Sequence, residues 1–161
     1  MAALNFNPTT TYTGSCHCGF IKYQCTLDLE TPHPATKAIL TKCNCTWCFK
    51  NGSLLASPGE LTVLSPLAPD TELTTYLFHN KTTKHQFCPK CGIECFFGGT
   101  LVSAGKTIQY YRVNVLTLDG RADGRPLEDL RKIKVMYWDG RKAGGGSAKG
   151  MGSEPWEGGV W

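Results

Sequence analysis

Seven of the nine cysteines in this 161-residue chain fall into three short clusters. The clusters are Cys16-His17-Cys18, Cys43-Asn44-Cys45-Thr46-Trp47-Cys48 and Cys88-Pro89-Lys90-Cys91. An odd number of cysteines cannot pair fully within one chain, and disulfides are rare in a reducing compartment. Closely spaced thiols that stay reduced are natural ligands for a soft metal ion without redox chemistry, and zinc is the first candidate.

Two of these clusters can complete one tetrahedral site. Cys88-Pro89-Lys90-Cys91-Gly92 has the spacing of a zinc knuckle, a tight turn that directs two thiolates to one ion. Cys16-His17-Cys18-Gly19 offers a second pair, again followed by a glycine. Together they predict a closed, structural four-cysteine zinc site that joins segments about 70 residues apart. The alternative for either turn alone is a buried cysteine pair that binds no metal.

The remaining cluster supplies three thiols, from Cys43, Cys45 and Cys48. Three thiolates leave the fourth position on zinc to water or substrate, which is typical of catalytic zinc. Because three thiolates give the zinc site a net charge of −1, the pattern favours binding and orienting a thiol over strong activation of water. The alternative is a second structural zinc whose fourth ligand is Cys25, Cys95 or a histidine.

The histidines are candidates for acid/base work. His79 and His85 lie around the Asn80-Lys81 turn, and either could exchange a proton near the open zinc or else be a surface residue. His17 lies between two predicted ligands, so we expect it to pack or to hydrogen-bond behind the metal site. His33, between two prolines, is expected in a loop.

Three further residues each have two interpretations. Cys95 begins an apolar run and is expected to be a core thiol, with a place near the catalytic metal as the alternative. Trp47 lies inside the three-cysteine segment and is expected either to wall a pocket or to pack. Asn114 is polar within an apolar run, so it either hydrogen-bonds a loop or faces a ligand.

The elements that position these residues are predicted to be mostly short strands. In residues 20–27, Phe20, Lys22 and Gln24 alternate with Ile21, Tyr23 and Cys25, which indicates a half-buried strand. Further strands are predicted within 36–45, 59–65, 73–80, 84–99 on both sides of the zinc knuckle, 107–120 and 130–140. One short helix is predicted at 125–133. This pattern predicts a mainly β fold in a single domain.

The composition changes near the C-terminal end. We expect an N-terminal segment at 1–12, a zinc-binding domain at 13–140 and a glycine-rich tail at 141–161 that is mobile or loosely docked. Trp156 and Trp161 are expected to cover a sheet edge or apolar surface, with a substrate lid as the alternative.

Composition and charge narrow the classes of partner. The chain is 41% hydrophobic and 19% charged, and no stretch approaches the length of a membrane span. The first residues lack the pattern of a secretory signal, so a cytoplasmic protein is expected, with the nucleus as the alternative. The net charge of +4 is too scattered for nucleic acid. Lys37, Lys42 and Lys50 flank the three-cysteine cluster; they either serve solubility or attract a small anionic molecule.

Four segments resemble the glutathione-dependent formaldehyde-activating enzyme family, which also contains centromere protein V. They are GSCHCGFIKY, KCNCTWCFKNG, HQFCPKCGIECFF and YRVNVLTLDG, and the resemblance extends over residues 13–140. It implies a β-tent of antiparallel sheets with zinc-binding turns and two zinc ions per chain. The structural ion would be held by Cys16, Cys18, Cys88 and Cys91, and the catalytic ion by Cys43, Cys45 and Cys48.

The resemblance also implies an activity, the condensation of formaldehyde with glutathione to S-hydroxymethylglutathione, which is a carbon–sulfur lyase reaction read in reverse. The prediction is therefore a zinc-dependent enzyme of this type acting on a small thiol adduct, with glutathione as the candidate thiol. One alternative is a zinc-dependent lyase or isomerase of another metabolite. The other is a non-catalytic zinc module for protein or chromatin binding, which the few basic residues of the tail (Arg141, Lys142, Lys149) disfavour. The oligomeric state is not predicted.

Overall fold

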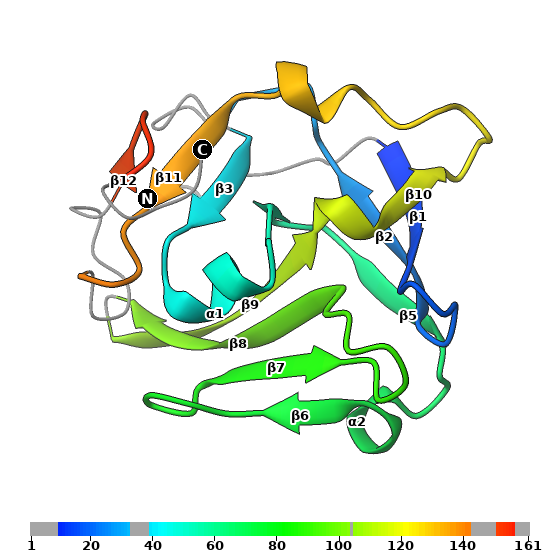
Figure 1. Cartoon of the computed structure of the whole chain (residues 1–161), viewed down its shortest axis with the longest axis horizontal. Helices are drawn as coiled ribbons and strands as arrows, with labels where there is room; N and C mark the ends of the chain where they lie inside the picture. Colours follow the sequence, from blue (N-terminus) through cyan, green and yellow to red (C-terminus); the bar gives the residue numbers. More distant parts are fainter. Residues whose placement is uncertain (1–9, 33–38, 104, 143–150, 157–161) are drawn as a thin grey trace. The chain divides into compact units, whose positions relative to one another are not determined.

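The computed structural model describes residues 10–32, 39–103, 105–142 and 151–156 of the chain (Figure 1). These residues belong to two compact units. The first unit comprises Met1–Asp28 and Ser57–Leu127, and the second comprises Leu29–Ala56 and Glu128–Trp161. No helix among the described residues is long and apolar enough to cross a membrane.

The first unit contains two antiparallel sheets. One has the strand order β10-β1-β2-β5, and the other runs β9-β8-β7-β6. The strands are β1 (Thr10–Ser15), β2 (Lys22–Leu27), β5 (Leu61–Ser65), β6 (Thr74–Tyr76), β7 (Thr83–Phe87), β8 (Phe96–Ser103), β9 (Lys106–Asn114) and β10 (Leu118–Arg121). Two short helices accompany them, α2 (Pro69–Glu72) and the 3₁₀ turn η1 (Val115–Thr117).

The second unit carries the three-cysteine segment. Its strands are ordered β12-β11-β3-β4, with bounds β3 (Leu40–Cys43), β4 (Leu55–Ala56), β11 (Val135–Trp138) and β12 (Met151–Gly152). β3 pairs in parallel with β11, and the other pairs are antiparallel. The single-turn helix α1 (Thr46–Lys50) follows β3, as the cyan segment of Figure 1 shows, and the 3₁₀ turn η2 (Leu130–Lys132) precedes β11.

The core of the first unit confirms the alternation predicted for residues 20–27. Ile21, Tyr23, Cys25 and Leu27 are all at most 2% exposed. The Tyr23 ring packs edge-on against Phe96 of the other sheet, with ring centroids 5.6 Å apart. Apolar side chains at every second position bury one face of β2 because successive side chains of a strand point to opposite faces.

The mainly β class and the antiparallel sheets are confirmed, but two predicted elements are wrong. The helix predicted at 125–133 is only the η2 turn, because the Asp129 carboxylate accepts the Arg131 N–H and closes a local turn instead. The strand predicted at 107–120 stops at Asn114, whose side-chain oxygen accepts the Leu116 N–H and starts η1. Gly120, expected to end that strand, lies inside β10.

The elements that the sequence did not predict include β1, β4, α1 and α2. The described part of the tail also differs from the expected loose segment, because β12 pairs with β11. The Trp156 indole N–H donates to the Tyr137 carbonyl of β11 at 3.1 Å, so Trp156 lies against the sheet of the second unit. Trp161 lies outside the described residues.

Candidate metal centres

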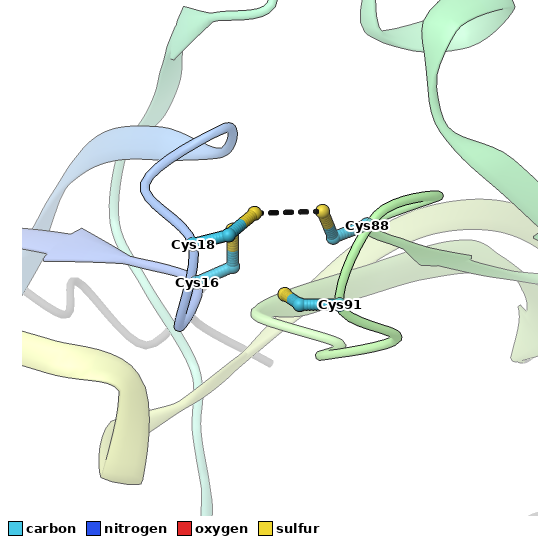
Figure 2. A group of neighbouring side chains, drawn as sticks. All are labelled: Cys16, Cys18, Cys88 and Cys91. Carbon is cyan, nitrogen blue, oxygen red and sulfur yellow. Dashed lines mark hydrogen bonds between the residues drawn. The ribbon is translucent and has the colours of Figure 1, made fainter.

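The structure brings Cys16, Cys18, Cys88 and Cys91 together as one four-cysteine cluster in the first unit (Figure 2). Their sulfur atoms all lie within 4.8 Å of one another. The Cys18 sulfur lies 3.6 Å from that of Cys16 and 3.5 Å from that of Cys88. Four thiolates arranged tetrahedrally about 2.3 Å from a zinc ion lie about 3.8 Å apart. The cluster therefore fits a tetrahedral metal ion with little rearrangement.

The two turns that carry this cluster are built alike. In each, the N–H of the first cysteine, Cys16 or Cys88, donates to the carbonyl of the residue five positions later. Gly19 and Gly92 adopt φ values of +74° and +75°, and each donates its N–H back to that cysteine's carbonyl. Glycine suits this backbone because it has no Cβ to clash at positive φ. The Ile21 N–H also donates to the Cys16 sulfur at 3.2 Å, a contact that stabilises a thiolate.

The structure also brings together the three-cysteine cluster, Cys43, Cys45 and Cys48, in the second unit. Cys43 ends β3, and Cys45 is the N-cap of α1, where its sulfur accepts the Cys48 N–H at 3.4 Å. Gly52, at φ +61°, reverses the chain after α1. The local sequence therefore places the three thiols on one strand end and one helical turn.

Among the described residues, no fourth cysteine, histidine or acidic side chain joins this cluster. Cys25 and Cys95, the two cysteines considered as a fourth ligand, are buried in the first unit, and burial raises the pKa of each to about 12. Both are core thiols, as expected for Cys95. His33 lies outside the described residues.

The protonation of the three-cysteine cluster explains why it suits a cation. Hydrogen bonds from the Cys43 and Cys48 thiols hold the pKa of Cys45 far below its ordinary value. The same contacts raise the pKa of Cys43 to about 11 and that of Cys48 further. Without a metal, Cys45 is therefore the first of the three thiols to ionise, and contacts with Cys43 and Cys48 favour its thiolate. Three thiolates this close repel one another strongly unless a cation lies among them.

Contacts of Asn44 with Asp139 and Arg141, called the brace below, support the three-cysteine cluster. Asp139 and Arg141 belong to the segment that follows β11 in the second unit. Asn44, between two ligands, is 6% exposed, and its side-chain amide donates to the Asp139 carboxylate at 2.8 Å. The Asn44 side-chain oxygen accepts the Arg141 backbone N–H at 3.2 Å. At Gly140, an added Cβ would lie 2.5 Å from the Cys43 sulfur. The Asp139–Arg141 segment therefore lies directly against the cluster.

Sequence reasoning did not assign this brace. Asp139 and Gly140 were interpreted only as the end of a strand, and Arg141 as the start of the tail. The parallel pairing of β3 with β11 explains their position, because parallel strands end at the same edge and Cys43 lies opposite Trp138. The sequence signal was an Asp-Gly-Arg segment directly after a predicted strand.

No histidine among the described residues belongs to either cysteine cluster. His85 is 4% exposed, so it is not the surface residue that one alternative predicted. Its Nδ1 lies 2.8 Å from a Glu94 carboxylate oxygen, and its ring stacks on Phe78 with centroids 5.0 Å apart. His79 is exposed at φ +53°. His17, which was expected to pack or hydrogen-bond, is exposed.

The structure also describes the two remaining candidates, Asn114 and Trp47. Asn114 is buried, and its side chain accepts the Leu116 N–H at 3.3 Å, which confirms the loop-bonding interpretation. Trp47 is half-buried in α1 between two cysteines of the three-cysteine cluster.

Comparison with known proteins places this geometry in a family. The sequence model of the glutathione-dependent formaldehyde-activating enzyme family matches residues 11–132, which include all seven clustered cysteines. A crystal structure of a Rhodobacter sphaeroides protein is 28% identical, with a TM-score of 0.50 over 76% of this chain and 98% of that one. The matched region contains both cysteine clusters, and the chain belongs to the glutathione-dependent formaldehyde-activating enzyme family.

Proposed function

We propose that the protein is a zinc-dependent enzyme of the carbon–sulfur lyase type that acts on a small thiol adduct, with glutathione and formaldehyde as candidate substrates. The observation that carries the proposal is the three-cysteine cluster, which no fourth donor joins among the described residues, within a chain of this family. Three-ligand sites are typical of catalytic zinc because the fourth position accepts a substrate.

The two clusters receive different roles in this proposal. The four-cysteine cluster would hold a structural zinc, because four thiols within 4.8 Å of one another supply all the ligands that a closed zinc site needs. Cys43, Cys45 and Cys48 would hold a second zinc, which when bound offers a position for a thiolate or a polarised oxygen. The free thiols of both clusters also favour a reducing compartment such as the cytoplasm.

The proposed reaction adds a thiol across the carbonyl group of an aldehyde. The sulfur–carbon bond forms as the carbonyl π bond breaks, and the proton of the thiol ends on the oxygen, so no oxidant or reductant is needed. In this chain, the buried Asn44–Asp139 contact keeps the loop between Cys43 and Cys45 in place. Holding the reactants in a fixed geometry removes much of the entropic barrier to such an addition.

Zinc content and glutathione binding test the proposal together. We expect two zinc ions per wild-type chain by elemental analysis and one in Cys45→Ser, with calorimetric glutathione binding lost in that variant. Cys25→Ser is the matched control, because Cys25 is a buried thiol outside both clusters and the variant should keep both ions. Exchange spectroscopy by NMR should show faster interconversion of formaldehyde, glutathione and their adduct with the wild type.

Other results would redirect or reject the proposal. Two zinc ions without glutathione binding would favour another small metabolite as substrate. A single zinc ion that Cys45→Ser leaves unchanged, even after zinc is added back, would reject the two-site interpretation. That result would favour a non-catalytic zinc module.

A further inference from the structure

We infer that Arg141 recognises a carboxylate of the thiol ligand at the three-cysteine cluster. This inference rests on the proposed function, because it names the chemistry of the ligand at that same site. It extends the proposal by naming the residue that binds the part of the ligand lying away from the metal position. The carboxylate could belong to glutathione or to any other small acidic thiol.

Arg141 is anchored to the loop that carries the cysteines. Its Nε donates to the Asn44 backbone carbonyl at 2.8 Å, and its backbone N–H donates to the Asn44 side chain at 3.2 Å. The guanidinium carbon also lies 5.7 Å from the centre of the Phe49 ring in α1. Since Asn44 lies between Cys43 and Cys45, these contacts hold the guanidinium beside the cluster before any ligand binds.

The guanidinium keeps most of its donors available. The chain contains four Asp-x-Arg segments, and in two of them, at 123–125 and 129–131, the arginine pairs with the aspartate two residues before it. Arg125 binds Asp123 at 2.6 Å and Arg131 binds Asp129 at 2.8 Å.

In the segment at 139–141 the aspartate binds another residue instead. Asp139 is buried, at 4% exposed, and accepts a hydrogen bond from Asn44. Within the described part of the chain, no carboxylate pairs with Arg141 and its two terminal nitrogens have no acceptor. Arg141 is exposed, so a ligand can reach it.

The net charge of a zinc-loaded three-cysteine cluster explains why an acidic ligand would need a cation such as Arg141. Three thiolates on a divalent ion leave one net negative charge, which repels an acidic ligand. A guanidinium offsets that charge, and its planar pair of N–H donors matches the two oxygens of a carboxylate. An acidic thiol can therefore place its sulfur at the metal position and its carboxylate on Arg141.

Two thiols, one with a free carboxylate and one with that carboxylate esterified, test the inference. The probes are 3-mercaptopropionate and its methyl ester, titrated calorimetrically into zinc-loaded wild type, Arg141→Gln and Lys142→Gln. Lys142 is the matched control, because it is the adjacent exposed residue and its loss changes the net charge equally. Zinc content is measured for each variant so that site occupancy is known.

The wild type and Lys142→Gln should both favour the acid over the ester. In Arg141→Gln, the ratio of the two dissociation constants should shift toward the ester by about threefold to tenfold, as expected for an exposed charged hydrogen bond. Affinity for the ester should stay unchanged. Because only the ratio is compared between variants, the different thiol acidities of the two probes cancel.

Three results would overturn the inference, and they differ in meaning. An unchanged ratio in Arg141→Gln would remove Arg141 from recognition while leaving the proposed function in place. An equal shift in both variants would assign the effect to net charge alone. If neither thiol binds the zinc-loaded wild type, the proposed thiol chemistry fails, and the inference fails with it.

Discussion

At the residue scale, two buried cysteines, Cys25 and Cys95, lie outside both cysteine clusters and belong to the core. Cys25 is 2% exposed within β2, and burial raises its pKa to about 12. Its ordinary value in an unfolded chain is close to 9. As pH rises above 9, the unfolded chain therefore loses this proton first, and the stability that the buried neutral thiol contributes decreases between pH 9 and pH 12.

We expect the cost of Cys25→Ala to depend on pH for this reason. The loss in the free energy of unfolding relative to wild type should be about 1.4 kcal/mol smaller at pH 10 than at pH 7. The reason is that pH 10 lies about one unit above the thiol pKa of the unfolded chain, so ionisation of Cys25 stabilises the unfolded wild type. Urea unfolding at the two pH values measures the difference. Leu27→Ala is the control, because Leu27 is equally buried in the same strand and does not ionise. An equal cost of Cys25→Ala at both pH values would contradict the prediction.

At the scale of elements, the parallel pairing of β3 and β11 brings the two sequence segments of the second unit together at the three-cysteine cluster. β3 delivers Cys43, and the residues after β11 lie against it. The buried contact between Asn44 and Asp139 fixes the two strand ends together. Residues that hold metal ligands in place without binding the metal commonly set the affinity of a site.

We expect Gly140→Ala to weaken metal binding at the three-cysteine cluster by at least about tenfold, because the new methyl group collides with the Cys43 sulfur. Competition with a chelating dye measures the affinity, and the zinc of the four-cysteine cluster should remain. Gly120→Ala is a suitable control, since its added Cβ would meet its nearest neighbour, the Arg125 carbonyl, at an ordinary 3.5 Å. Normal zinc affinity in Gly140→Ala would show that the brace does not control the cluster.

At the scale of the whole molecule, the four-cysteine cluster links distant parts of the first unit. The turn after β1 supplies Cys16 and Cys18, and the turn after β7 supplies Cys88 and Cys91. Cys18 and Cys88 are 70 residues apart in the sequence. A metal ion at this cluster would close a long loop and so stabilise the folded chain against the unfolded one.

Metal removal should therefore lower the thermal stability of the protein. After exhaustive chelation, we expect a large drop in Tm, with hydrogen exchange protection lost first in β1, β2, β7 and β8, and recovery when zinc is added back. Cys45→Ser, which lacks only a ligand of the three-cysteine cluster, should retain most of the wild-type Tm. A protein shown by elemental analysis to be zinc-free, yet with an unchanged Tm, would argue against a structural metal.

The sequence alone was enough to predict the cysteine clusters and the alternation of β2. Both depend on short-range geometry, because a tight turn directs nearby thiols together and a strand alternates its faces. Pairing the turns of Cys16 and Cys88 was also predictable, since each offers two thiols and a complete site needs four. At two of the places where local prediction failed, a side chain accepts the backbone N–H two residues further on, as Asn114 and Asp129 do at the two 3₁₀ turns.

Only the tertiary structure decided what surrounds the three-cysteine cluster. Asn44 and Asp139 are 95 residues apart, and neither residue alone indicates a partner. The parallel register of β3 on β11 brings them together and turns Asp139 toward Asn44, away from the pairing with Arg141 that the Asp-x-Arg segments at 123–125 and 129–131 would predict. Which polar groups meet, and which cation is left available, depends on long-range strand pairing that spacing along the chain does not encode.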